Sequence, residues 1–69
     1  MAPKTAEQFN EIRQRSSQKI KEAAFDLFGE VGFKSTTIQA IAKRAGISKG
    51  LIYNYFESKE AILESILSD

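Results

Sequence analysis

The sequence of 69 residues contains no cysteine, no histidine and no tryptophan. Without cysteine the chain has no disulfide framework, which is compatible with a reducing cytosol. The absence of both cysteine and histidine also removes the usual metal ligands, thiolates and general bases, so metal and nucleophilic chemistry have little to use. We therefore expect a protein that is not an enzyme and that needs no cofactor.

The sequence also has a single proline and no long apolar run. The only proline is Pro3, so no later residue lacks a backbone donor or has its φ angle locked by a ring. The N-terminus is polar, and no stretch approaches the roughly 20 apolar residues needed to span a bilayer. A chain of 69 residues is one small domain, with no room for a large pocket. These properties predict a soluble, all-α fold.

Apolar periodicity predicts the longest helix from Ser16 or Ser17 to Val31. Gly32 can end this helix in the left-handed conformation, and Phe33 can then fold back on Leu27 or Phe28. Phe25 lies off the buried stripe, so it either packs against the missing part of a longer protein or is an exposed aromatic residue. The stripe consists of Ile20, Ala23, Ala24, Leu27, Phe28 and Val31.

The two ends of the chain are less regular. Residues 1–15 have only a weak apolar pattern, and we expect a flexible arm that can instead extend the first helix. A last helix begins near Ser58, and its apolar side is broad enough to suggest contact with something absent from the chain. We assign residues 16–69 to one small bundle of three helices and the start of a fourth. The apolar residues of this last helix are Ile62, Leu63, Ile66 and Leu67.

Residues 36–56 have the pattern of a helix-turn-helix. The apolar residues of a first helix over 37–45 recur at helical spacing, and either Thr36 or Thr37 can cap its N-terminus. Gly46 can stop this helix in a sharp turn, and Ser48 can cap a second helix that runs to about residue 56. The second helix turns two apolar residues inward, Ile52 and Phe56.

The outer face of this second helix carries Lys49, Gly50, Tyr53 and Asn54. A cation, a glycine that permits close approach, a phenol and an amide suit a nucleic-acid groove better than a protein core. Residues 33–59 contain five basic groups and one acidic group, a net charge of +4, whereas residues 1–32 are balanced and residues 60–69 carry three acids. This distribution predicts a surface that displaces counterions from phosphates.

Two stretches together resemble a known family over residues 19–67. They are KIKEAAFDLFGEVGF, residues 19–33, and GFKSTTIQAIAKRAGISKGLIYNYFESKEAILESIL, residues 32–67. Their motif order and spacing resemble the N-terminal DNA-binding domain of the TetR family of bacterial transcription repressors. The resemblance implies a homeodomain-like helix-turn-helix fold whose second helix, about 48–56, reads the major groove.

The resemblance also implies roles for individual residues. The family's phosphate contacts match Thr36, Thr37 and Lys59, and a further backbone contact matches Tyr55. The family's base contacts match a group in the recognition helix. That group consists of Ser48, Lys49, Gly50 and Tyr53, and Gln39 and Asn54 complete the predicted DNA-binding set.

Family members are longer than this chain and carry a C-terminal domain that dimerises and binds a small-molecule inducer. The resemblance therefore implies a homodimeric repressor on a palindromic operator in the bacterial cytoplasm, associated with the nucleoid. Nothing in this sequence corresponds to the C-terminal domain. We expect the present chain alone to be monomeric or weakly associating.

Simpler interpretations of the same side chains stay open. Lys43 and Arg44 can form a solvated face, and Lys59 can be an ordinary surface residue. Tyr53 and Tyr55 can pad the core and expose only their hydroxyls. The alternative function is a helix-turn-helix used for protein–protein interaction, which would favour a neutral or apolar outer face on the second helix.

Overall fold

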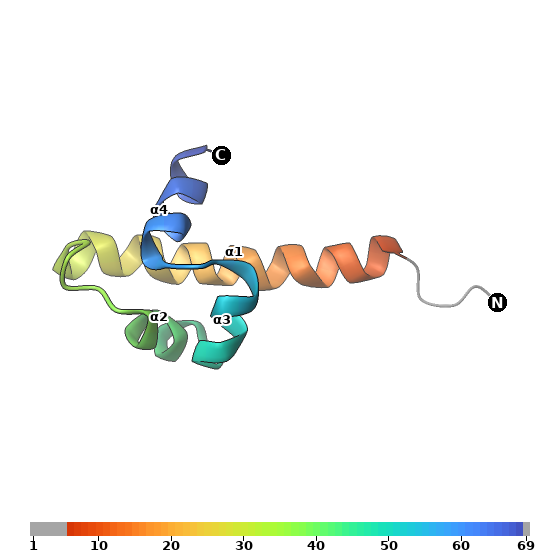
Figure 1. Cartoon of the computed structure of the whole chain (residues 1–69), viewed down its shortest axis with the longest axis horizontal. Helices are drawn as coiled ribbons and strands as arrows, with labels where there is room; N and C mark the ends of the chain where they lie inside the picture. Colours follow the sequence, from red (N-terminus) through yellow and green to blue (C-terminus); the bar gives the residue numbers. More distant parts are fainter. Residues whose placement is uncertain (1–5, 69) are drawn as a thin grey trace.

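The computed structural model describes residues 6–68, with side chains described from residue 15 onward. Within this range the chain forms four α-helices and no strand (Figure 1). They are α1 (Ala6–Val31), α2 (Ile38–Ala45), α3 (Lys49–Tyr55) and α4 (Lys59–Ser68). The predicted all-α fold is confirmed.

The first helix begins ten residues earlier than the predicted start at Ser16, because α1 opens at Ala6. Residues 6–15 contain no glycine or proline, so local propensity does not interrupt the helix there. Of the two possibilities for the predicted arm, extension of the helix is therefore observed over residues 6–15. Residues 1–5 lie outside the described part of the chain.

Helix α1 is the support on which the other helices assemble. In Figure 1, α2 and α3 lie on one side of its C-terminal half and α4 lies on the other, while its N-terminal part extends beyond them. Helix α1 packs against both α2 and α4, and α2 packs against α3. Every helix contributes to one buried apolar cluster, which consists of Ile20, Ala23, Ala24, Ile41, Ala42, Ile52 and Ile62.

The predicted stripe of α1 is confirmed except at its end. Leu27 and Phe28 are partly buried and pack against the cluster, whereas Val31 is 52% exposed. Val31 is the last residue of α1, and beyond it the chain turns at Gly32, which has a φ of 88°. Phe33 then packs on Phe28, with 5.0 Å between the ring centroids. The predicted contact of Phe33 with the helix is therefore confirmed.

The corner between α2 and α3 also forms as expected. Gly46 has a φ of 74°, in the left-handed region, and its N–H donates to the carbonyls of Ala42 and Lys43. The Ile47 N–H donates to Ala42 O at 3.0 Å, and the Ile47 side chain packs against the core. Glycine is the residue that adopts this conformation at least cost, so it fixes the corner.

Apolar side chains remain exposed on both α1 and α4. Phe25 is 63% exposed and Leu67 is 75% exposed, so Phe25 is an exposed aromatic residue in this chain. Phe25 and Ile66 line a shallow groove together with polar side chains of α1. Among the described residues, no helix combines the length and apolar content needed to cross a membrane.

Candidate nucleic-acid interface

Each helix of the helix-turn-helix starts at a hydroxyl cap. Thr37 Oγ1 accepts a hydrogen bond from Ala40 N at 3.0 Å, and Ser48 Oγ accepts one from Leu51 N at 3.0 Å. Of the two threonines considered as caps for α2, Thr37 therefore has this role. In both caps the oxygen is the acceptor and the residue is exposed, so the hydroxyl hydrogen can be donated to a partner outside the protein.

The outer face of α3 is accessible along its length. Lys49, Gly50, Tyr53 and Asn54 are all exposed, and Tyr53 retains 49% of its surface. Tyr53 follows Lys49 by four positions, and Asn54 follows Gly50 by four, so these residues share one side of the helix. Ile52, on the other side, is fully buried. The helix is thus held by its apolar face and presents its polar face outward.

Gly50 is not explained by crowding within the protein. A Cβ placed on Gly50 would meet none of the described atoms within 4 Å, and the residue has ordinary helical geometry. Glycine inside a helix is less favourable than alanine by about 1 kcal/mol. The bare backbone at this position is therefore available for close approach by an external partner.

Thr36 is buried, unlike its neighbour Thr37. Its side chain is 1% exposed, and its hydroxyl donates to Gly32 O at 2.8 Å. In this structure the Thr36 hydroxyl is therefore engaged within the protein, and its contact with DNA stays a prediction. Because Thr36 is held in the turn before α2, it supports the exposed Thr37.

Lys59 also has partners other than the predicted phosphate. Its ammonium donates to three backbone carbonyls, those of Phe33 at 2.7 Å, Lys34 at 3.2 Å and Thr36 at 3.0 Å. An ammonium group has three donors, so this geometry directs all of them into the turn between α1 and α2. In this structure the Lys59 ammonium is thus engaged within the protein, and its direct contact with DNA stays a prediction. Lys59 is also no ordinary surface residue.

The two tyrosines of α3 have different environments. Tyr55 is half-buried and packs against the core, as the simpler interpretation allowed, whereas Tyr53 is exposed on the outer face. The two residues are two positions apart on a helix, so their side chains point in different directions. Tyr53 is therefore the more exposed aromatic residue of α3, and the backbone contact of Tyr55 stays a prediction.

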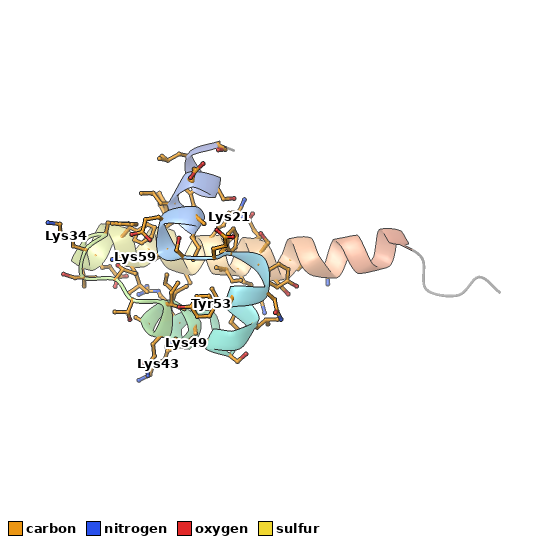
Figure 2. All side chains as sticks on the ribbon, viewed as in Figure 1. Lys21, Lys34, Lys43, Lys49, Tyr53 and Lys59 are labelled. Atoms are coloured by element: carbon orange, nitrogen blue, oxygen red, sulfur yellow. The ribbon has the colours of Figure 1, made fainter. Side chains whose placement is uncertain are left out.

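Exposed lysines surround this face. Lys43 and Lys49 lie on the side of the α2–α3 pair that points away from α1, and Lys34 lies at the turn after α1 (Figure 2). Lys34 and Lys43 were outside the predicted DNA-binding set. Their contribution to the local charge was visible in the sequence, but the direction of each side chain was not.

Arg44 differs from its neighbour Lys43 because it is paired. Arg44 Nη2 lies 2.7 Å from a Glu30 carboxylate oxygen, and its Nε lies 3.9 Å from Asp26. The hydrogen bond to Glu30 raises the pKa of the Arg44 guanidinium. The pair connects α2 to α1, and the charge of Arg44 is already balanced by these carboxylates.

Among the residues that the structure describes, no three histidine, cysteine, aspartate or glutamate side chains are placed to hold a metal ion. Thr37, Gln39 and Ser48 at the helix starts, and Lys49, Gly50, Tyr53 and Asn54 on α3, remain as the exposed members of the predicted set.

Residues 20–66 match the family model of bacterial regulatory proteins of the tetR family. The chain belongs to the TetR family. It is 53% identical over 49 residues to the uncharacterized HTH-type transcriptional regulator YuxN of Bacillus subtilis, a match covering 71% of this chain and 17% of that protein.

Two other relatives match more of the chain. The HTH-type transcriptional regulator BetI of Klebsiella pneumoniae is 41% identical over 58 residues, which cover 84% of this chain and 28% of BetI. The HTH-type transcriptional regulator SrpR of Pseudomonas putida is 37% identical over 68 residues, which cover 99% of this chain and 30% of SrpR. The chain thus spans less than a third of the length of each of these relatives.

Proposed function

We propose that this TetR-family chain binds double-stranded DNA in a sequence-specific manner, with α3 lying in the major groove. The observation that carries the proposal is the shared outer face of α3, on which Lys49, Gly50, Tyr53 and Asn54 are all exposed. A protein-interaction surface would favour neutral or apolar residues there. The regulator names of the relatives support the same function.

In this proposal α3 supplies the base contacts. The Lys49 ammonium suits the two acceptors on the major-groove edge of guanine, O6 and N7. Tyr53 brings a hydroxyl and an aromatic ring, and the Asn54 amide both donates and accepts hydrogen bonds. Gly50 lets the helix backbone come closer to the base pairs than a residue with a side chain would allow.

The phosphate contacts flank α3 on two sides. The Thr37 and Ser48 hydroxyls accept hydrogen bonds from backbone N–H groups at the starts of α2 and α3, and each keeps a hydrogen that it can donate to a phosphate. The positive end of a helix dipole also favours an anion there. Gln39 lies in the first turn of α2 and is exposed. Lys34 and Lys43 add charge at the edges of this surface.

The longer TetR relatives suggest the setting of this domain. We infer that the whole protein is a non-enzymatic transcriptional repressor in the cytoplasm, bound to nucleoid DNA. A homodimer would place two copies of α3 on a palindromic operator, with half-sites about one helical turn or more apart. A small-molecule inducer would bind outside the present chain and change the separation of the two copies.

Selection from randomised duplexes tests the proposal. The chain is fused to a C-terminal leucine zipper, because a single copy of a small reading surface binds weakly, and bound duplexes are sequenced after several rounds. We expect an enriched palindromic motif, lost in Lys49→Ala, and affinity for it that falls steeply with rising salt. No enrichment over the input pool, or an affinity insensitive to salt, would contradict DNA recognition.

A further inference from the structure

The Lys59 ammonium is the centre of the turn that joins α1 to α2. Figure 2 places Lys59 at the start of α4, beside the end of α1 that carries the turn. Its Nζ donates to the carbonyls of Phe33, Lys34 and Thr36 at 2.7, 3.2 and 3.0 Å. The same atom lies 4.5 Å from the centroid of the Phe33 ring. One side chain of α4 therefore holds three backbone groups that are 23 to 26 positions away in the sequence.

These contacts explain why a lysine is tolerated at this point. Lys59 is the first residue of α4, where the positive end of the helix dipole disfavours a cation. Three carbonyl oxygens and an aromatic ring face compensate for that repulsion. Of the three carbonyls, that of Phe33 also accepts the Thr36 N–H of the turn, so Lys59 adds a second donor there.

The turn held by Lys59 leads directly to the proposed phosphate contacts. Within it, Thr36 N–H donates to Phe33 O at 3.2 Å and the Thr36 hydroxyl donates to Gly32 O at 2.8 Å. The next residue is Thr37, the exposed cap of α2. Lys34, whose carbonyl is one of the three acceptors, carries an exposed ammonium. The position of Lys59 thus sets the positions of both groups.

We propose that Lys59 is a positioning residue for DNA binding: it does not touch phosphate, but it fixes the turn that carries Lys34 and Thr37 and couples this turn to the first turn of α4. The inference rests on the proposed DNA-binding function. A displacement of the start of α4 would move the phosphate contacts of α2 with it.

Three variants separate positioning from direct contact. Lys59→Met keeps most of the side-chain volume and removes the donors. Lys59→Arg keeps the charge, but a planar guanidinium cannot direct donors at three carbonyls as a compact ammonium does. Lys43→Met is the matched control, since it removes the same charge from an exposed lysine outside the turn. Circular dichroism confirms that each variant is folded.

The first measurement uses the chain without DNA. Amide hydrogen exchange of Thr36, whose N–H is bonded to Phe33 O, reports the order of the turn. We expect exchange at Thr36 to accelerate at least about tenfold in Lys59→Met and unchanged exchange in Lys43→Met. Unaltered protection of Thr36 in Lys59→Met would overturn the proposal.

The second measurement is the salt dependence of binding to the selected duplex. A lysine on a phosphate contributes about 0.9 to the slope of log Kd against log salt concentration. We expect Lys59→Met to weaken binding roughly tenfold, equivalent to about 1.4 kcal/mol, with an unchanged slope. We expect Lys59→Arg to fail to restore the affinity.

The outcomes distinguish the two proposals. A slope lowered by about 0.9 in Lys59→Met, or full affinity in Lys59→Arg, would show direct phosphate contact and overturn only the positioning role. If the unaltered chain shows no preference for any duplex, the proposed function fails, and the positioning role fails with it. Loss of affinity at constant slope, together with faster exchange at Thr36, supports the positioning role.

Discussion

The Arg44 guanidinium on α2 forms a hydrogen-bonded ion pair with Glu30 on α1, with 2.7 Å between Nη2 and Oε2. Its neighbour Lys43 is exposed on the side of the α2–α3 pair that points away from α1 (Figure 2). Two adjacent cations in the same helix therefore serve different purposes. Arg44 holds α2 against α1, and Lys43 contributes to the positive surface around α3.

This difference predicts that removing the charge of Lys43 affects DNA binding, whereas removing the charge of Arg44 affects stability. Lys43→Ala should lower the slope of log Kd against log salt concentration for DNA by up to about 0.9, because its charge is not balanced by a carboxylate. Arg44→Ala should leave that slope nearly unchanged and lower the thermal midpoint slightly, by less at high salt. Fluorescence anisotropy on one labelled duplex and thermal unfolding supply both measurements. Equal slope changes in the two variants would contradict this division.

The pairing of Arg44 should not make stability depend on pH under cellular conditions. Glu30 raises the pKa of the guanidinium, so the folded-state pKa lies above the unfolded one. The stabilisation is then complete below the unfolded pKa and is lost only as the pH rises through the folded value. Both values are far above cellular pH, so Arg44→Lys and the unaltered chain should show parallel stability curves between about pH 6 and 9. A divergence within this window would contradict the assignment.

Gly46 and Gly50 should respond in opposite ways to alanine. Gly46→Ala places a Cβ at a φ of 74°, so the free energy of unfolding should fall by about 1–2 kcal/mol. The substitution leaves every side chain of α3 in place, so DNA affinity in the folded fraction should change little. Urea denaturation, followed by circular dichroism, measures the stability change. Unchanged stability would mean that the corner relaxes to accept a side chain.

For Gly50→Ala we expect higher stability and weaker DNA binding. The new Cβ has open space within the described protein and improves helix propensity, so stability should rise by about 0.5–1 kcal/mol. The methyl group also enters the space where α3 would approach the base pairs. Binding to the selected duplex should therefore weaken although the domain is more stable. Undiminished affinity would show that the backbone of α3 does not come close to DNA at this position.

Much of this fold was predictable because its signals are local. The corner at Gly46, the helix end at Gly32 and the cap at Ser48 each depend on residues within one turn, and all three form as predicted. The predicted start of α1 was wrong. Where the sequence has no stop signal, it does not determine where a helix begins. Ser16 and Ser17, where the helix was predicted to begin, lie inside it.

The roles of Thr36 and Lys59 depend on contacts that no local pattern contains. The carbonyl partners of Lys59 are 23 to 26 positions away, and they become neighbours only when α4 packs on α1. Thr36 and Thr37 are adjacent and chemically identical, and only the path of the turn buries one and exposes the other. By contrast, the outer face of α3 could be predicted, because helical periodicity alone assigns its residues to one side.

Substitutions of Thr36 and Thr37 should distinguish an effect on stability from an effect on DNA binding. Thr36→Val removes the buried hydroxyl that donates to Gly32 O, so the free energy of unfolding should fall by about 1–3 kcal/mol. Thr37→Val removes an exposed cap, which should cost about 1 kcal/mol, and it also removes a proposed phosphate contact. Per folded molecule, DNA affinity should therefore fall more in Thr37→Val. Chemical denaturation and anisotropy titrations on the same samples provide the comparison, and a larger affinity loss in Thr36→Val would reverse the assignment.

Tyr53 and Tyr55 of α3 should likewise show separate effects, one on DNA binding and the other on stability. Tyr53→Ala removes an exposed ring, so stability should change by no more than about 0.5 kcal/mol, whereas DNA binding should weaken by about 1–3 kcal/mol if the ring meets base edges. Tyr55→Ala removes a ring that packs against the core, so the free energy of unfolding should fall by about 2 kcal/mol. The two variants remove identical atoms, so each is the control for the other. A stability loss in Tyr53→Ala as large as in Tyr55→Ala would mean that Tyr53 supports the fold, and α3 would then lose its aromatic contact to DNA.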